Sequence, residues 1–209
     1  MVNGPSRQKP AGAAEGLGRR GSAGPRRSKA AADAIIEAAV AVLTEDGYAG
    51  FTIERVARRA GAGKPTIYRW WSGKPALLLE IYARQSLDLS ATDTGALESD
   101  LMAVFRLLFR FWRGTPAGQA FIAILVEAQH DPAALQALRA FVAERTYPLA
   151  DPFDRAARRG DLAADFDLAA TLDLVSGYVW ARLLTRQLDE DHEALASAAR
   201  IIVRGSLRR

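Results

Sequence analysis

Apolar side chains recur at helical intervals along the chain from residue 28 onward. The first such stretch carries five of them at three- and four-residue steps: Ile35, Ile36, Ala39, Val42 and Leu43. That spacing places them on one face of an α-helix. Ser28 stands where the pattern begins. Gly47 stands where it stops, because glycine readily adopts the left-handed conformation that ends many helices. The pattern therefore predicts a first helix from Ser28 to Gly47.

Three shorter elements follow this helix. Thr52 is placed to cap a second helix, which Gly61 ends. Residues 64–71 form the third predicted helix. Ser72-Gly73 then interrupts the pattern, and Pro75 opens a fourth helix because proline is favoured in the first helical turn.

The remainder of the chain is predicted to be helical throughout. Apolar positions at helical spacing cover residues 77–82, 101–112, 121–126, 135–147, 148–159, 167–188 and 190–207. This part of the chain has no sustained period-two alternation and no Asn-Gly or Asp-Gly pair, which are the usual signals of strands and hairpins. The sequence therefore predicts an all-α fold.

The first 27 residues differ from the rest. They are rich in Gly, Ala, Pro, Ser and Arg and hold few large aliphatic side chains. Such a segment buries too little apolar surface to offset the entropy of ordering it, so we expect a disordered basic tail over residues 1–27. The net charge is +5 over this tail, +2 over residues 28–74 and −3 over residues 75–209. A basic front suits docking on a polyphosphate, although the tail's arginines are equally compatible with plain solvation.

Several classes of function find no support in the sequence. Cysteine is absent, and the two histidines, His130 and His192, lie far apart. We therefore expect no disulfide, no metal site, no cofactor and no enzymatic activity, since the motifs of phosphate loops and nucleophile elbows are also missing. No apolar run is long enough to span a membrane, and no hydrophobic segment follows the N-terminal charges. We expect a cytoplasmic protein without a membrane partner.

Residues 52–71 carry the pattern of a helix-turn-helix. Ala57 supplies the small residue needed where the second helix crosses the first, and Gly61, four positions later, tolerates a positive φ in the turn. Four further residues fall on the inward positions of the same arrangement: Val56, Ala60, Ala62 and Ile67.

The outward face of the third predicted helix suits a DNA groove. Ile67 and Trp71 lie one turn apart and form its buried side. The opposite face carries four residues that can contact DNA: Pro65, Thr66, Tyr68 and Arg69. Arginine can fork onto guanine, threonine and proline can touch a thymine methyl group, and tyrosine can donate to a phosphate. Trp70, on the flank, either joins this surface or packs.

These residues, together with Ser72-Gly73-Lys74-Pro75, resemble the DNA-binding domain of the TetR family over residues 28 to 80. The resemblance implies that Thr52 and Lys74 contact phosphates and that the third helix enters the major groove. It implies DNA-binding roles for Thr52, Lys64, Pro65, Thr66, Tyr68, Arg69, Trp70 and Lys74. A common family pattern ends this helix in Tyr-x-His-Phe, whereas this chain has Tyr68-Arg69-Trp70-Trp71, so the role of Trp70 stays open.

The resemblance also implies the domain plan. We expect a helix-turn-helix DNA-binding domain over residues 28–74 and a helical effector-binding and dimerisation domain over residues 75–209. One set of residues is expected to line a pocket for a small, mostly apolar effector: Phe105, Phe109, Trp112, Phe121, Tyr147, Tyr178, Trp180 and Arg182.

The family further implies a homodimer through the last two helices, which binds an inverted-repeat operator in double-stranded DNA. Leu168, Leu172, Val175, Val179 and Leu183 form a stripe on the first of these helices, and we expect Val175 and Val179 at the dimer interface. The function predicted is that of an effector-released repressor. Two alternatives stay open at this point: a DNA-binding protein without an effector, which would lack an enclosed cavity, and an enzyme, which would need convergent titratable groups.

Overall fold

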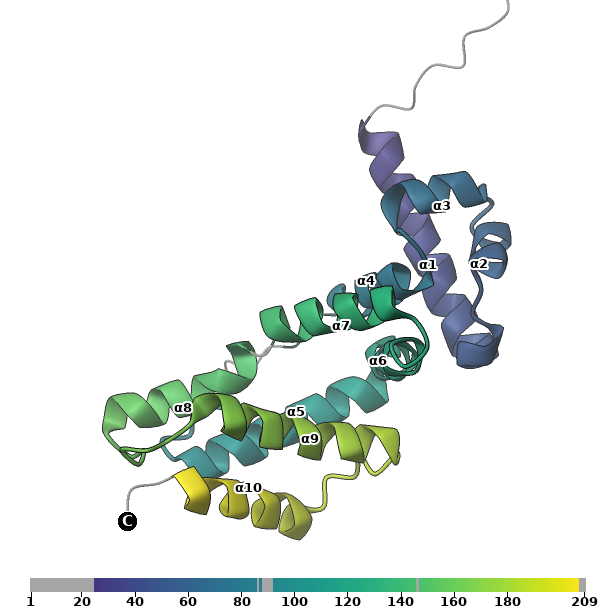
Figure 1. The fold of residues 1–209 in the computed structure, drawn as a ribbon. Helices are drawn as coiled ribbons and strands as arrows, with labels where there is room; N and C mark the ends of the chain where they lie inside the picture. Colours follow the sequence, from purple (N-terminus) through teal and green to yellow (C-terminus); the bar gives the residue numbers. More distant parts are fainter. Residues whose placement is uncertain (1–24, 86, 88–91, 146, 207–209) are drawn as a thin grey trace, which may run out of the picture.

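The computed structural model describes residues 25–85, 87, 92–145 and 147–206, and over these residues the chain forms ten α-helices and no strand (Figure 1). The predicted all-α fold is confirmed. No helix in the described ranges combines the length and the apolar character that crossing a membrane requires. The expected disorder of residues 1–24 lies outside the described residues.

The N-terminal end of the molecule consists of α1 (Pro25–Gly50), α2 (Ile53–Arg59) and α3 (Lys64–Trp70). The first helix begins three residues earlier than predicted, so residues 25–27 are helical rather than part of the tail. Alanine-rich sequence after this start favours the helix. Gly47 interrupts α1 with a φ of +64°, as its place in the sequence predicts, and the chain returns to helix up to Gly50.

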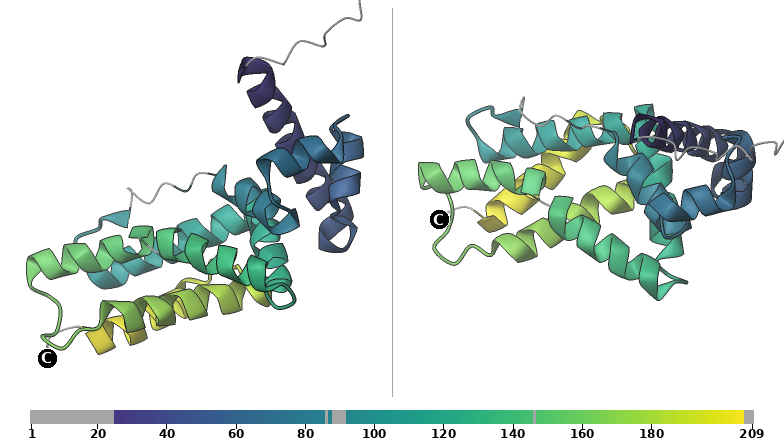
Figure 2. Two further views of the ribbon diagram at one scale, coloured as in Figure 1. Left: turned by 45° about the horizontal axis from the view of Figure 1, so that its top comes forward. Right: turned by 90° about the horizontal axis from the view of Figure 1, so that it is seen from above.

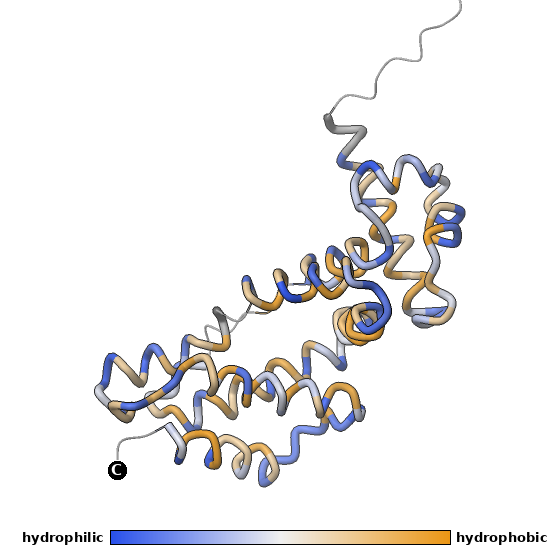
Figure 3. The backbone as a smooth tube through the Cα atoms, in the orientation of Figure 1, coloured by the Kyte–Doolittle hydropathy of each residue, from blue (hydrophilic) through white to orange (hydrophobic). Residues whose placement is uncertain are grey.

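Helix α4 (Lys74–Ala83) packs against α1 on one side and against α6 (Pro116–Glu127) on the other. Its buried side chains are Leu77, Leu78 and Ile81. Helix α6 also packs against α1, and it is apolar around most of its circumference, as its end-on view in Figure 3 illustrates. A helix of that kind lies inside the structure. Together α4 and α6 join the helix-turn-helix to the rest of the chain.

The larger part of the molecule contains α5 (Leu97–Gly114), α7 (Pro132–Arg145), α8 (Tyr147–Arg159), α9 (Leu168–Leu184) and α10 (His192–Ser206). Helix α5 packs against α6, α8, α9 and α10. Figure 2 shows these helices as an elongated body with α1, α2 and α3 at one end. The last helix begins at His192 rather than at residue 190, because Asp191 caps it by accepting a hydrogen bond from the Glu193 amide at 3.0 Å.

A buried polar cluster ties α5 to α8. The fully buried Asp100 carboxylate accepts hydrogen bonds from the Thr94 amide at 2.7 Å and from Arg155 Nη2 at 3.1 Å. Arg155 also donates to the Thr92 carbonyl at 3.2 Å. Because each charge has partners, the cluster compensates the cost of burying them and fixes the segment that precedes α5.

Helices α5 and α6 come unusually close at Gly118. A Cβ atom at this position would lie 2.3 Å from the backbone oxygen of Trp112. Only glycine therefore permits this approach, which brings the Trp112 ring beside Phe121 of α6, with centroids 6.0 Å apart.

The prediction that Val175 and Val179 of α9 lie at the dimer interface is wrong. Val175 and Val179 are fully buried within their own protomer, among the helices that α9 covers. The outward side of α9 and α10 instead presents Leu174, 66% exposed, and Ile201, 71% exposed. Helical spacing identified an apolar stripe correctly, but it could not tell whether the chain itself or a second chain covers that stripe.

Candidate DNA-contacting helix and apolar pocket

The turn between α2 and α3 has the local structure that its sequence predicts. The Thr52 hydroxyl caps α2 by accepting a hydrogen bond from the Arg55 amide at 3.2 Å. Gly61 adopts a φ of +61°, and the Ala62 amide then donates to the Ala57 carbonyl at 2.9 Å. This hydrogen bond closes the end of α2 and directs the chain into α3.

Helix α3 buries one side and exposes the other. Ile67 and Trp71 are buried, as the helical positions predict, and α3 packs against α1 and α2. Tyr68 is 51% exposed and Trp70 is 44% exposed. The Trp70 ring also lies beside the Trp71 ring, with centroids 6.4 Å apart, so Trp70 both packs and faces solvent. Pro65 and Arg69 are exposed, and Thr66 is half-buried.

Ion pairs lie on α3 and on the helices beside it. Lys64 pairs with Glu54 of α2, and the hydrogen bond from Lys64 holds the pKa of the Glu54 carboxyl below its usual value. Arg55 and Asp46 pair at 2.8 Å. Within the described part of the chain, Arg69 forms no ion pair. Its guanidinium is therefore available to an outside acceptor.

Lys74 lies at the junction of three helices. Its ammonium is 2.6 Å from Glu127 Oε1 at the end of α6 and 3.9 Å from the centre of the Tyr48 ring near the end of α1. The Tyr48 hydroxyl donates to the same carboxylate oxygen at 2.9 Å. Burial, followed by the Glu127 carboxylate, raises the pKa of Tyr48 to about 12, so the hydroxyl remains a donor at neutral pH. No signal in the sequence joins residues 48, 74 and 127.

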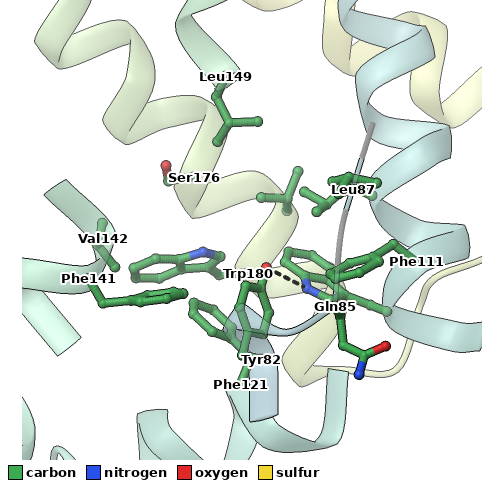
Figure 4. Close-up of a pocket in the computed structure, with 13 residues that line it drawn as sticks. Tyr82, Gln85, Leu87, Phe111, Phe121, Phe141, Val142, Leu149, Ser176 and Trp180 are labelled. Carbon is green, nitrogen blue, oxygen red and sulfur yellow. Dashed lines mark hydrogen bonds between the residues drawn. The ribbon is translucent and has the colours of Figure 1, made fainter. Parts of the chain in front are cut away.

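An apolar pocket opens between α4, α5, α6, α7, α8 and α9. Its volume is about 110 Å³. Thirteen residues line it: Tyr82, Gln85, Leu87, Leu108, Phe111, Trp112, Phe121, Phe141, Val142, Leu149, Ser176, Val179 and Trp180. Figure 4 shows the aromatic rings gathered on one side, with Leu149 and Ser176 on another.

The aromatic side chains of the pocket pack against one another. The Tyr82 ring lies edge-on to Phe141 at 5.3 Å, and Trp180 lies edge-on to Phe121 at 5.6 Å. Trp112 Nε1 donates to the Tyr82 hydroxyl at 3.3 Å, the dashed contact in Figure 4. These orientations are the ones that aromatic pairs favour. The pocket therefore offers a firm apolar wall, with polar groups at Gln85 and Ser176.

Three of the predicted pocket residues line this cavity: Trp112, Phe121 and Trp180. Phe105 and Phe109 instead pack around the Tyr178 ring, at 5.1 and 6.5 Å between centroids. Arg182 donates to Gln187 at 3.1 Å and does not line the pocket. The side chain of Tyr147 lies outside the described residues. Phe111, Tyr82 and Phe141 also line the pocket and are not among the predicted residues, because residue type alone does not show which helix faces meet.

Comparison with known proteins places this arrangement in a class. Residues 35–81 match the family model described as bacterial regulatory proteins of the tetR family, and residues 91–202 match the Tetracyclin repressor-like C-terminal domain. The chain is a helix-turn-helix transcriptional regulator, and it belongs to the TetR family.

Individual relatives agree with this assignment. The DNA-binding transcriptional repressor TetR of Mycobacteroides abscessus is 31% identical over 75% of this chain and 84% of its own length. The uncharacterized regulator YdeS of Bacillus subtilis is 29% identical over 72% of this chain and 77% of its own. Among solved structures, the TetR family regulator SCO0332 is 28% identical, with a TM-score of 0.63 over 84% of this chain and 97% of its own.

Proposed function

We propose that this regulator is a repressor that binds an inverted-repeat operator as a homodimer and is released by a small, mostly apolar effector. The observation that carries the proposal is the double role of α4. This helix follows the recognition helix α3 directly, and its Tyr82 forms part of the pocket wall. A molecule that enters the pocket and displaces Tyr82 therefore disturbs the packing of the helix that directly follows α3 and contacts α1.

On the DNA side, α3 is the part that enters the major groove. Arg69 reads a guanine, and Pro65 and Thr66 contact thymine methyl groups. Tyr68 donates to a phosphate, and Trp70 lies against the sugar-phosphate backbone beside it. Thr52, Lys64 and Lys74 contact phosphates at the edges of the same surface.

On the effector side, the character of the pocket supports an apolar ligand. Six aromatic rings and several aliphatic side chains form its walls. An engineered apolar cavity of comparable size stays dry and binds benzene, so a cavity of this kind favours an apolar guest over water. A regulator of the same fold, FadR of Bacillus subtilis, has been crystallised with stearoyl-CoA; it is 17% identical, with a TM-score of 0.60 over 83% of this chain and 96% of its own. That complex shows that a protein of this fold can bind a molecule that carries a long acyl chain.

The outward faces of α9 and α10 support dimerisation. A shallow groove there is lined by Leu174, Tyr178, Ala198, Ile201 and Ile202, among others. Exposed apolar side chains that gather in one contiguous patch often mark an interface. The same patch can pair with itself around a two-fold axis. Such a dimer presents two copies of α3 to two half-sites, which makes the operator an inverted repeat.

Operator release tests the proposal. An operator is first selected from random duplex DNA, and its Kd is measured by fluorescence anisotropy. The uncharged fluorophore N-phenyl-1-naphthylamine then reports pocket occupancy, and compounds that displace it are added to the operator complex. We expect at least one displacing compound to raise the operator Kd tenfold or more.

A pocket variant and a matched control complete the experiment. Ser176→Phe adds a ring inside the pocket and should abolish both fluorophore binding and operator release. Gln136→Phe adds the same ring on the exposed side of α7 and should change neither. Operator binding that no pocket ligand alters would favour the alternative of a DNA-binding protein without an effector.

A further inference from the structure

The contact of Lys74 with Glu127 and Tyr48 joins the DNA-binding end of the molecule to the last residue of α6. We propose that Glu127 competes with an operator phosphate for the Lys74 ammonium and thereby sets the affinity for DNA. This inference rests on the proposed function, in which α3 and Lys74 face the operator. Glu127 is in this sense a positioning residue, because it acts on DNA only through Lys74.

The position of the Lys74 ammonium is unfavourable for a positive charge unless an anion lies beside it. Lys74 is the first residue of α4, and the positive end of the helix dipole disfavours a positive charge there. The first turn of α4 contains no acidic residue, and Gly73 provides no side-chain cap. Glu127 supplies the missing negative charge from α6. A DNA phosphate beside α3 would supply the same charge from outside.

The two anions repel each other at this position. Lys74 is only 25% exposed and Glu127 only 19%, so both charges are shielded from solvent. The Tyr48 ring covers a further side of the ammonium. A phosphate that reaches the ammonium while Glu127 stays in place brings two negative charges within a few ångströms of each other. Their repulsion opposes binding, because partial burial weakens the screening by water.

Tyr48 strengthens the hold of Glu127. Its hydroxyl donates to the oxygen that contacts Lys74, so the carboxylate is fixed from two helices at once. Release of Lys74 to DNA therefore breaks an arrangement of three groups. Since Glu127 lies six residues after Phe121 on α6, the same helix also forms part of the pocket wall. The contact is placed where movement between α4 and α6 would tighten or loosen it.

A double-mutant cycle tests the inference without any effector. The operator Kd is measured as a function of salt for wild type, Glu127→Gln, Lys74→Ala and the double variant. We expect Glu127→Gln to tighten operator binding by about three- to tenfold, the range of a modest ion-pair coupling. Lys74→Ala should weaken binding and reduce the slope of log affinity against log salt by about one unit, because the protein then neutralises one phosphate fewer. In the Lys74→Ala background, Glu127→Gln should have no effect.

Controls separate this competition from a general change in charge. Glu80→Gln makes the same change on α4, where Glu80 pairs with Arg84, and should leave the Kd unchanged. Tyr48→Phe keeps the ring but removes the hydrogen bond to Glu127, and should tighten binding in the same direction. This second variant also tests the inference if Glu127→Gln disturbs folding, which thermal unfolding followed by circular dichroism would reveal.

The outcomes distinguish the inference from the proposed function. An unchanged or weaker affinity in folded Glu127→Gln, or an equal gain in the Lys74→Ala background, overturns the competition while operator binding stands. If Lys74→Ala binds the operator with wild-type affinity, Lys74 makes no phosphate contact and the inference is wrong. The role proposed for Arg69 is not affected by that result. A wild-type protein that selects no operator overturns the proposed function itself.

Discussion

The rings of Tyr82 on α4 and Phe121 on α6 lie with their centroids 5.2 Å apart, and both line the pocket. This aromatic contact therefore forms part of the pocket wall. It also forms part of the packing between α4 and α6, which join the DNA-binding end to the rest of the molecule. In the proposed release mechanism, a ligand that shifts one ring against the other changes the packing between α4 and α6.

The exposed face of α3 is tested by two substitutions with different expected signatures. Arg69→Ala should cost about 1–3 kcal/mol in operator binding and relax the base preference at one position, because it removes a forked hydrogen-bonding group that reads guanine. Tyr68→Phe should lower affinity by the same factor on all operator sequences, because a phosphate contact carries no base information. Binding to a series of single-base operator variants measures both. An Arg69→Ala protein with unchanged affinity and preference would contradict the role given to this face.

The proposed dimer interface is tested by an aspartate on each of the last two helices. Ile201→Asp places a charge on the exposed side of α10, and we expect a folded monomer that has lost operator binding. Val175→Asp places the same charge in the core of the protomer, and we expect the chain itself to unfold, since an unpaired buried charge costs several kcal/mol. Light scattering and circular dichroism separate the two results. A wild-type monomer at micromolar concentration, or a dimeric Ile201→Asp, would be incompatible with this interface.

The close approach at Gly118 predicts a stability effect. Gly118→Ala should lower the free energy of unfolding by about 1–3 kcal/mol, because the added methyl group collides with the backbone of Trp112. Gly114→Ala is the matched control, as a Cβ atom there meets nothing within 4 Å, and we expect a change of roughly 0.5 kcal/mol or less. Urea denaturation measures both variants. Equal stability of the two would mean that α5 and α6 separate easily.

The raised pKa of Tyr48 predicts a difference in alkaline stability. Folding favours the protonated hydroxyl, so its contribution is fully present below pH 10, the ordinary value for tyrosine, and is lost as the pH rises toward about 12. The advantage of wild type over Tyr48→Phe in free energy of unfolding should therefore shrink between pH 9 and pH 12. Urea titrations of both proteins across this range measure the difference. If the difference in free energy of unfolding between the two proteins stays constant with pH, the Tyr48 hydroxyl is exposed to water in the folded protein.

The local structure of the helix-turn-helix was predictable because it depends on neighbouring residues. Thr52 caps α2 by bonding to an amide only three residues further on, and Gly61 adopts the left-handed conformation that the turn requires. The buried positions of Ile67 and Trp71 follow from helical spacing alone. Each of these features needs only a few consecutive residues, so the sequence contains the whole cause.

The pocket and the dimer face were less predictable because they depend on how helices meet. Phe105 and Phe111 are the same residue type on the same helix, yet only Phe111 lines the pocket. Val175 and Leu174 are adjacent, yet one is in the core and the other faces out. Contacts such as that of Tyr48 with Glu127 join residues 79 positions apart. No periodicity encodes such distances.

Because α4 contributes to two packing surfaces, this chain cannot be cut into independent modules after that helix. A fragment that ends at Ala83 would keep α1 to α4 but leave bare the side of α4 that α6 covers. A chimera that grafts these first four helices onto another family member would need a compatible α6, including an acidic partner for Lys74. Exchange of operator preference between such proteins is therefore simplest by changing exposed residues of α3 that form no ion pair with a neighbouring helix among the described residues, such as Arg69.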